Sequence, residues 1–207
     1  MPRRIAIALP LVFILVIVAA ARAEFTSKEW QQLKNGEVII TEVLNPNADG
    51  SQRSDFLAKL YVKADRQTVW KYLRDYEKFP EFMPNVVVCK IIKRDGQVYW
   101  VHYEAKVMIV KAVYNLRVEG VELNKKIVFK LDKTQPSTIR DTAGYWILED
   151  APDGSGTVLS YSTYVDTGIP APEALARQAA KKSLPQVVKN MRMRIESGGK
   201  WKKEPGT

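Results

Sequence analysis

The 207-residue sequence is poor in the residues that most catalytic and metal sites need. Its single cysteine, Cys89, excludes an internal disulfide and any multi-cysteine metal or redox site. Its single histidine, His102, excludes a histidine-rich metal centre and leaves one residue to support any Ser-His-Asp triad. We therefore expect no metal and no cofactor, and we assign no catalytic residue. The remaining composition, 46% hydrophobic and 27% charged, is that of an ordinary globular chain.

Residues 1–23 have the pattern of an export signal. Arg3 and Arg4 precede an uncharged apolar run, 5–21, and the segment 21–23 (Ala-Arg-Ala) has the small-x-small pattern of a signal-peptidase site. An uncleaved N-terminal anchor is the alternative, because the run is at the lower edge of the length that spans a bilayer. Either interpretation places the rest of the chain outside the cytosol, which in a bacterium is the periplasm. A single cysteine fits that oxidising compartment.

The net charge of +9 is concentrated towards the C-terminus. The segment 172–196 contains six basic and two acidic residues, and three more lysines follow in 198–207. A basic face binds nucleic acid or anionic lipid, or is simply solvated. Because export argues against nucleic acid, we expect a solvated surface, with weak attraction of the basic C-terminal helix to a membrane surface as the alternative.

The chain divides into four segments, of which the third is a strand-rich domain. Turn signals such as Asp95-Gly96 separate strands that follow one another without intervening helices, which predicts one antiparallel sheet. The expected strands are 37–43, 54–62, 86–92, 97–108, 112–122, 126–131, 142–149 and 157–166, with a loop at 45–50. The segments are 1–23 (signal peptide or anchor), 24–53 (extension with a short helix and a strand), 54–197 (the α+β domain) and 198–207 (flexible tail).

Two helical regions accompany the sheet. A helix that Asp65 caps is followed by a break at Pro80 and Pro84, so a second short helical piece should present aromatic side chains. A long helix begins at Pro172 and is interrupted by Pro185, where we expect a kink. Its apolar residues recur at near-helical spacing, which predicts one buried face: Leu175, Ala179, Leu184, Val188, Met191 and Ile195.

Alternation within the strands predicts which side chains face the core. The odd positions of 97–110 are apolar or aromatic, whereas the even positions include His102, Glu104 and Lys106. Residues 143–148 alternate poorly, so the choice between Tyr145 and Trp146 stays open. The expected inward-facing residues are Tyr99, Val101, Tyr103, Ala105, Val107, Ile109, Tyr114, Leu116, Val118, Ile127, Phe129, Leu131, Leu159, Tyr161 and Thr163.

Two stretches of the sequence resemble those of a known superfamily. The segment 69–86, VWKYLRDYEKFPEFMPNV, and the segment 144–172, GYWILEDAPDGSGTVLSYSTYVDTGIPAP, are similar to segments of polyketide cyclase/dehydrase-like and coenzyme Q-binding START-domain proteins. The resemblance to this START-like (SRPBCC) superfamily covers about residues 54–196. It implies the helix-grip fold, in which a curved antiparallel sheet wraps around a long C-terminal helix and two short helices follow the first core strand.

The resemblance also implies a hydrophobic cavity between the sheet and the last helix, and an apolar or lipid-like ligand such as a polyprenyl quinone, a sterol or an acyl chain. We therefore expect an exported binding protein. The alternatives are a partner-binding or structural domain with a filled core and, third, an aromatase/cyclase-type enzyme, which would need an acid–base pair in the cavity. The candidate ligand-binding residues are Phe79, Phe82, Met83, Tyr99, Tyr103, Tyr114, Phe129, Tyr161, Val188 and Met191; the phenylalanines could instead plug the core, and the tyrosines could pair with one another.

Overall fold

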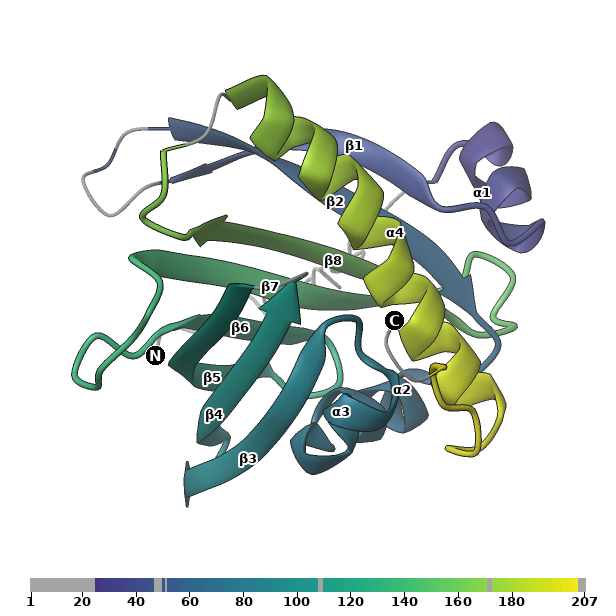
Figure 1. Cartoon of the computed structure of the whole chain (residues 1–207). Helices are drawn as coiled ribbons and strands as arrows, with labels where there is room; N and C mark the ends of the chain where they lie inside the picture. Colours follow the sequence, from purple (N-terminus) through teal and green to yellow (C-terminus); the bar gives the residue numbers. More distant parts are fainter. Residues whose placement is uncertain (1–24, 47–49, 51, 108–109, 171–172, 205–207) are drawn as a thin grey trace, which may run out of the picture.

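Eight strands form one antiparallel sheet that curves around the last helix (Figure 1). The structure is a computed structural model and describes residues 25–204 except 47–49, 51, 108–109 and 171–172. The spatial order of the strands is β1-β2-β8-β7-β6-β5-β4-β3. Their bounds are β1 (Ile39–Pro46), β2 (Gln52–Val62), β3 (Val86–Asp95), β4 (Val98–Val107), β5 (Val110–Glu122), β6 (Lys126–Leu131), β7 (Asp141–Asp150) and β8 (Thr157–Asp166).

The helices lie at the two ends of the chain and between β2 and β3. Helix α1 begins with a reciprocal capping box between Thr26 and Glu29, and the Asp65 side chain accepts a hydrogen bond from the backbone of α2. A break and short helical pieces follow α2 as expected, but α2 already ends at Leu73, and Pro80 lies in the first turn of α3 instead of breaking a helix. The helices are α1 (Ser27–Lys34), α2 (Arg66–Leu73), the 3₁₀ helix η1 (Tyr76–Lys78), α3 (Phe79–Phe82) and α4 (Glu173–Glu196).

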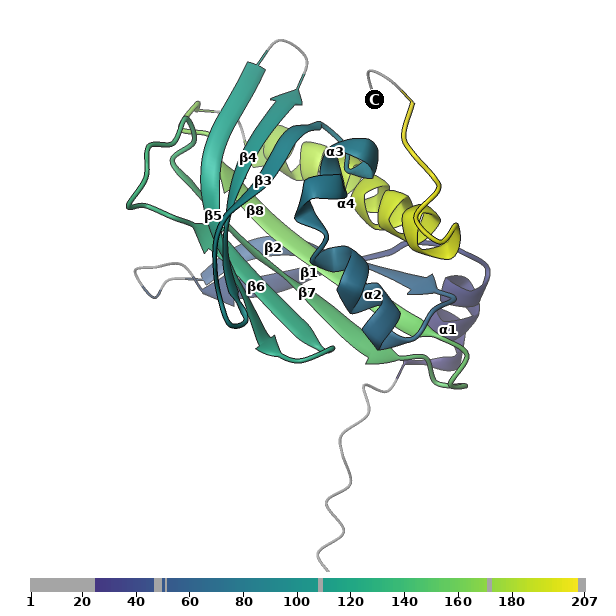
Figure 2. The same ribbon diagram turned by 90° about the horizontal axis from the view of Figure 1, so that it is seen from below.

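The sheet and the helices enclose one hydrophobic core, and this arrangement confirms the predicted helix-grip fold. Seen from below, α4 lies along the concave face of the sheet with α2 and α3 beside it (Figure 2). Directly opposite residues of neighbouring strands share a face. Ala58, Tyr161, Trp146 and Ile127 form one such row across four strands, and all four are buried. The register therefore settles the open choice in β7 in favour of Trp146.

The strand predictions hold except near the first hairpin. The loop expected at 45–50 starts later, because pairing of Asn45 and Pro46 with the beginning of β2 continues β1 to Pro46. Pro46 is tolerated because β1 is an edge strand. Val107 and Ile109, expected to face inward, lie outside the described side chains.

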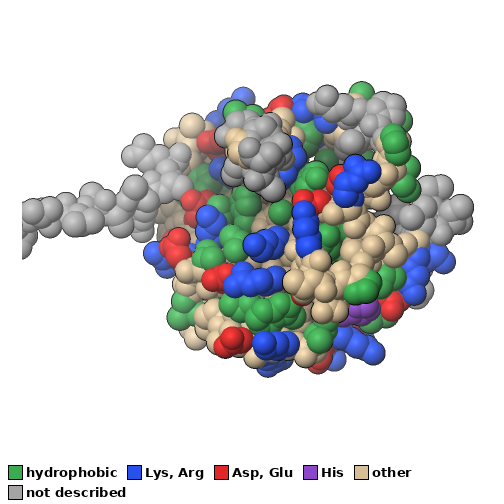
Figure 3. Space-filling view, turned by 90° about the vertical axis from the view of Figure 1, so that its left-hand side faces the viewer, with side chains coloured by type: hydrophobic (Ala, Val, Ile, Leu, Met, Phe, Trp, Pro, Cys, Tyr) green, Lys and Arg blue, Asp and Glu red, His purple; other side chains and the backbone are tan. Residues whose placement is uncertain are grey.

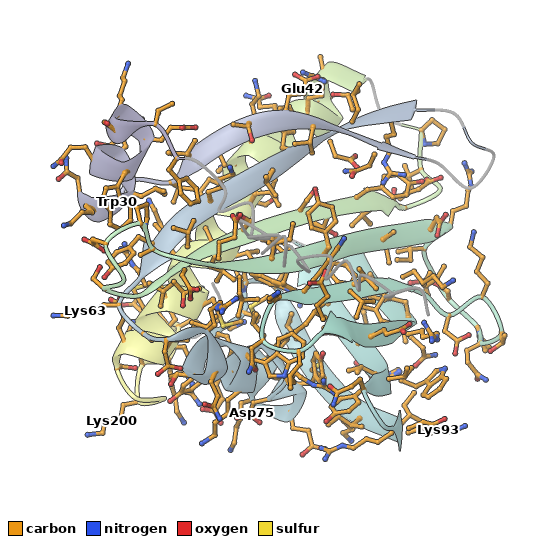
Figure 4. The ribbon with its side chains drawn as sticks, turned by 180° about the vertical axis from the view of Figure 1, so that it is seen from behind. Trp30, Glu42, Lys63, Asp75, Lys93 and Lys200 are labelled. Carbon is orange, nitrogen blue, oxygen red and sulfur yellow. The ribbon has the colours of Figure 1, made fainter. Side chains whose placement is uncertain are left out.

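Helix α4 departs from its predicted burial. Leu184, Val188, Met191 and Ile195 are buried as expected, and the helix runs continuously through Pro185. Leu175, however, is 58% exposed, and Ala179 is also exposed, so the prediction of one stripe buried along the whole helix is wrong. The first part of α4 is held by its polar side instead, since Arg177 bonds Glu42 of β1 at 2.8 Å (Figure 4).

Candidate functional site

An interior cavity of about 170 Å³ lies between the concave face of the sheet, α3 and α4. Of the described lining residues, helix α4 contributes only Val187, and the segment around α3 contributes three. The rest of the lining comes from η1 and from the six strands β3 to β8. The lining residues are Tyr76, Phe79, Met83, Pro84, Val86, Tyr103, Ala105, Tyr114, Leu116, Val118, Ile127, Phe129, Thr142, Trp146, Tyr161, Thr163, Val165 and Val187.

Six of the ten candidate residues line this cavity: Phe79, Met83, Tyr103, Tyr114, Phe129 and Tyr161. The other four lie outside the lining. Phe82, Val188 and Met191 are buried in the packed core. Tyr99 lies near the β3–β4 hairpin, where the guanidinium groups of Arg74 and Arg94 stack on its ring.

The aromatic side chains of the cavity are packed in pairs. The rings of Tyr103 and Tyr114 are stacked with their centroids 5.6 Å apart, and those of Trp146 and Tyr161 are stacked with their centroids 4.0 Å apart. Each ring of such a pair restricts the orientation of the other, and the pair contributes about 0.5–1.5 kcal/mol beyond the energy of burying its surface area. The walls are therefore largely preformed.

Gly144 makes room for the ring of another lining residue, Phe129. The Phe129 side chain covers Gly144 of the neighbouring strand, and a Cβ atom at Gly144 would lie 2.3 Å from the Phe129 Cζ atom. It would also lie 2.4 Å from the Ser162 carbonyl oxygen, so any larger residue at Gly144 would displace the ring or the backbone beside it.

Every titratable group that the described lining offers is a phenol held neutral by burial. Desolvation raises the pKa of Tyr161 to about 12 and raises the pKa values of Tyr76, Tyr103 and Tyr114 well above the ordinary range. Next to Tyr103, burial also raises the pKa of the Cys89 thiol to about 12. The site therefore supplies aromatic surface and uncharged hydroxyl groups.

Polar contacts fix the α3 wall to the C-terminal half of α4 and to the tail. The buried Asn190 donates to the Phe82 carbonyl at 2.7 Å, and the buried Arg194 donates to Glu81 at 2.8 Å. The ammonium group of Lys203 donates hydrogen bonds to the carbonyl oxygens of Met83 and Val86. The segment predicted as a flexible tail thus holds the wall of the cavity that Phe79 and Met83 form.

The opposite side of the cavity reaches the surface. Val165 is a lining residue and is 53% exposed, and Val187 and Ala105 are also partly exposed. Ile169 and Leu175 are exposed hydrophobic residues in the connection to α4 and in its first turn. Viewed from the side on which α4 begins, the surface carries Lys and Arg side chains interspersed with hydrophobic ones (Figure 3).

Two other hollows are larger but do not form comparable sites. One, of about 390 Å³, lies on the convex face of the sheet, where four of its five charged lining residues form two ion pairs: Arg53 with Asp55 at 2.8 Å and Arg117 with Glu119 at 2.6 Å. For the other, of about 540 Å³, the described lining consists of four residues of α4. Ligand sites are concave, largely apolar and contain a few polar groups, and the interior cavity has that character.

Among the described residues, no group of His, Cys, Asp and Glu side chains is placed to hold a metal ion. No helix in the described part of the chain is long and apolar enough to cross a membrane.

Several lining residues could not be predicted from the sequence. Tyr76, Thr142 and Val187 gave no signal, because their positions depend on how distant elements meet. Trp146 also lines the cavity, but the poor alternation of residues 143–148 gave no basis for choosing it over Tyr145.

A curved sheet closed by a C-terminal helix over an uncharged cavity defines a START-like helix-grip protein. The chain belongs to the family described as polyketide cyclase/dehydrase and lipid transport, whose model matches residues 62–192. No curated protein matches the chain significantly.

Solved structures of low sequence identity share the fold. A START superfamily protein from Mycobacterium smegmatis is 18% identical, with a TM-score of 0.59 over 68% of this chain and 96% of that one. A STAR-related lipid transfer protein from Xanthomonas axonopodis is 20% identical, with a TM-score of 0.56 over 75% and 98% of the two chains. Human StAR-related lipid transfer protein 5 is 12% identical, with a TM-score of 0.59 over 79% and 84%.

Proposed function

We propose that this protein binds a hydrophobic or lipid-like small molecule in the interior cavity. The observation that carries the proposal is an apolar cavity with preformed aromatic walls and neutral hydroxyl groups. The family description, which includes lipid transport, supports it, as do two similar structures named for lipid transfer.

Residues 1–23 lie outside the described residues, and we propose that they export the protein to the periplasm. Cleavage after Ala23 is our preferred form of this proposal, and an uncleaved anchor that faces the periplasm is the alternative. In both forms the ligand is taken up outside the cytosol, close to a membrane.

The basic C-terminal helix would then assist encounters with that membrane. Lys181 and Lys182 are exposed on α4 near the exposed Leu175, on the half of the helix that is not packed into the core. Each basic residue near an anionic lipid surface contributes about 1 kcal/mol. We propose that this half of α4 brings the mouth of the cavity to the lipid.

One observation favours the alternative of a structural or partner-binding domain. The cavity of about 170 Å³ is smaller than the roughly 300–1,000 Å³ that is typical of ligand pockets. A ligand larger than one ring must therefore extend through the mouth or widen the cavity. An aromatase/cyclase would need an acid–base pair, for which the described lining residues supply hydroxyl groups only.

The test is to express the full chain in a Gram-negative bacterium, fractionate the cells, and analyse the purified protein by native mass spectrometry. We expect a periplasmic protein whose intact mass shows loss of residues 1–23, together with a bound small molecule that organic solvent releases. A periplasmic protein that carries nothing and takes up no lipid or quinone from extracts would contradict ligand binding. A cytosolic protein would contradict export.

A further inference from the structure

Within the described part of the chain, two tyrosine hydroxyl groups of the cavity have no hydrogen-bond partner. The hydroxyl group of Tyr103 lies beside the Cys89 thiol, and that of Tyr161 lies beside Thr163. For Tyr76 and Tyr114, by contrast, the described residues supply no hydrogen bond. Buried phenols usually find a partner, so these two hydroxyl groups call for an explanation.

Neither hydroxyl group is sealed off in the interior. Among the described residues, the Ser160 Oγ atom is the only polar side-chain atom that is sealed and also unpartnered. The unpartnered hydroxyl groups of Tyr76 and Tyr114 therefore keep some accessible surface. Both residues line the cavity, which places their side chains next to the space where a ligand would lie.

The described lining contains no Lys, Arg, His, Asp or Glu residue. A carboxylate or phosphate inside this space would be a buried charge without a counter-ion, which is strongly unfavourable. Since burial raises the pKa values of Tyr76 and Tyr114, both hydroxyl groups stay protonated at neutral pH and remain donors.

The size of the cavity sets the part of the ligand that fits. An apolar cavity of about 150 Å³ is large enough for a benzene ring. The 170 Å³ present here therefore accommodates one ring or a short chain end with an attached oxygen atom.

Building on the proposed function, we propose that the ligand is uncharged and inserts a ring or chain end that carries a hydrogen-bond-accepting oxygen, which Tyr114 or Tyr76 engages. Ketones, esters and ethers belong to this class, and ionised fatty acids do not.

Three probes of similar size separate the possibilities: acetophenone, ethylbenzene and benzoate. Each is titrated into the isotope-labelled full chain, and the shifts of amide signals from β4, β5 and β8 are followed by NMR. We expect acetophenone to bind most tightly, ethylbenzene about two- to tenfold more weakly because it makes no hydrogen bond, and benzoate not to bind at neutral pH.

The substitutions Tyr114→Phe and Tyr76→Phe remove one hydroxyl group each and keep the ring. At least one of them should weaken acetophenone binding about two- to tenfold and leave ethylbenzene binding unchanged. Tyr145→Phe is the matched control, because Tyr145 lies on the convex face and should change neither.

The outcomes separate the two proposals. If none of the probes binds, hydrophobic binding in this cavity is wrong. If ethylbenzene binds as tightly as acetophenone, if neither tyrosine variant affects acetophenone, or if benzoate binds equally well, the cavity is a ligand site but the ligand class is wrong.

Discussion

The two halves of α4 have the same helical pattern but opposite environments. In the C-terminal half, Leu184, Val188, Met191 and Ile195 are buried, and Glu196 accepts a hydrogen bond from the backbone of Lys63. In the N-terminal half, 174–183, no described side chain is buried. An apolar stripe therefore shows what a helix can bury, and the neighbouring elements decide what it does bury.

The difference also divides the rim of the cavity into a fixed side and an open side. The packed half holds α3 through Asn190 and Arg194. The unpacked half is tied to β1 by Arg177 and leaves Leu175 in solvent. We infer that ligand passes on the open side, and the following predictions test the contrast.

The largest difference should appear when an apolar residue of each half is truncated. Met191→Ala leaves a void in the core and should lower the free energy of unfolding by about 2–5 kcal/mol. Leu175→Ala should change it by less than about 0.5 kcal/mol, because the side chain is already exposed. Urea denaturation of both variants measures the two effects. Equal losses would show that the N-terminal half packs as tightly as the C-terminal half.

Removing the ion pair of each half should give a smaller difference in the free energy of unfolding. Arg194→Gln removes partly buried hydrogen bonds to Glu81 and to the Trp201 carbonyl and should cost about 1.5–3 kcal/mol. Arg177→Gln removes an exposed pair with Glu42 and should cost at most about 1 kcal/mol. The same denaturation experiment applies. The fixed-side assignment fails if Arg177→Gln proves the more costly change.

Acid should weaken the two attachments of α4, which are the Arg177–Glu42 pair to β1 and the Arg194–Glu81 pair to α3. The pKa of each carboxyl group reports on one pair. Hydrogen bonds from Arg177 and Ser54 lower the pKa of Glu42 from 4.5 to about 2. Desolvation opposes ionisation of Glu81, but hydrogen bonds from Lys78 and Arg194 outweigh it, so its pKa is also lowered.

Because both pKa values are lower in the folded protein, each pair stabilises the fold fully above pH 4.5, and this contribution is lost as the pH falls through the lowered value. In a carboxyl NMR titration, Arg177→Gln should return the pKa of Glu42 towards 4.5 and leave that of Glu81 unchanged. If both values move together, the two attachments are not independent.

Local patterns predicted most of the fold and part of the site. The Asp95-Gly96 turn and strict alternation placed Tyr103 and Tyr114 on the concave face, where they line the cavity. The same alternation put Tyr99 on that face, but its position at the hairpin end takes it beyond the cavity to Arg74 and Arg94. Alternation gives the face of a strand and carries no information on distance along it.

The remaining errors have a similar cause. Exposure of Leu175 and the role of Val187 in the lining depend on the angle at which α4 crosses the sheet, which no local pattern contains. The same holds for the tail: Lys203 reaches the carbonyls of Met83 and Val86, more than a hundred residues earlier in the chain.

The most direct test of the account is whether blocking the cavity blocks binding. Ala105→Phe places a ring in the cavity from β4, whereas Lys106→Phe adds the same ring to the opposite, exposed face. Thermal melting checks that both variants fold, and Val187→Trp blocks the cavity from α4 should Ala105→Phe not fold. Each protein is titrated with acetophenone, an uncharged one-ring probe that fits a cavity of about 170 Å³, and binding is followed by the NMR shifts of amide signals. We predict binding to the wild type and to Lys106→Phe, and at least tenfold weaker binding to the blocked variant. Equal binding by all, or none by the wild type, would contradict the account.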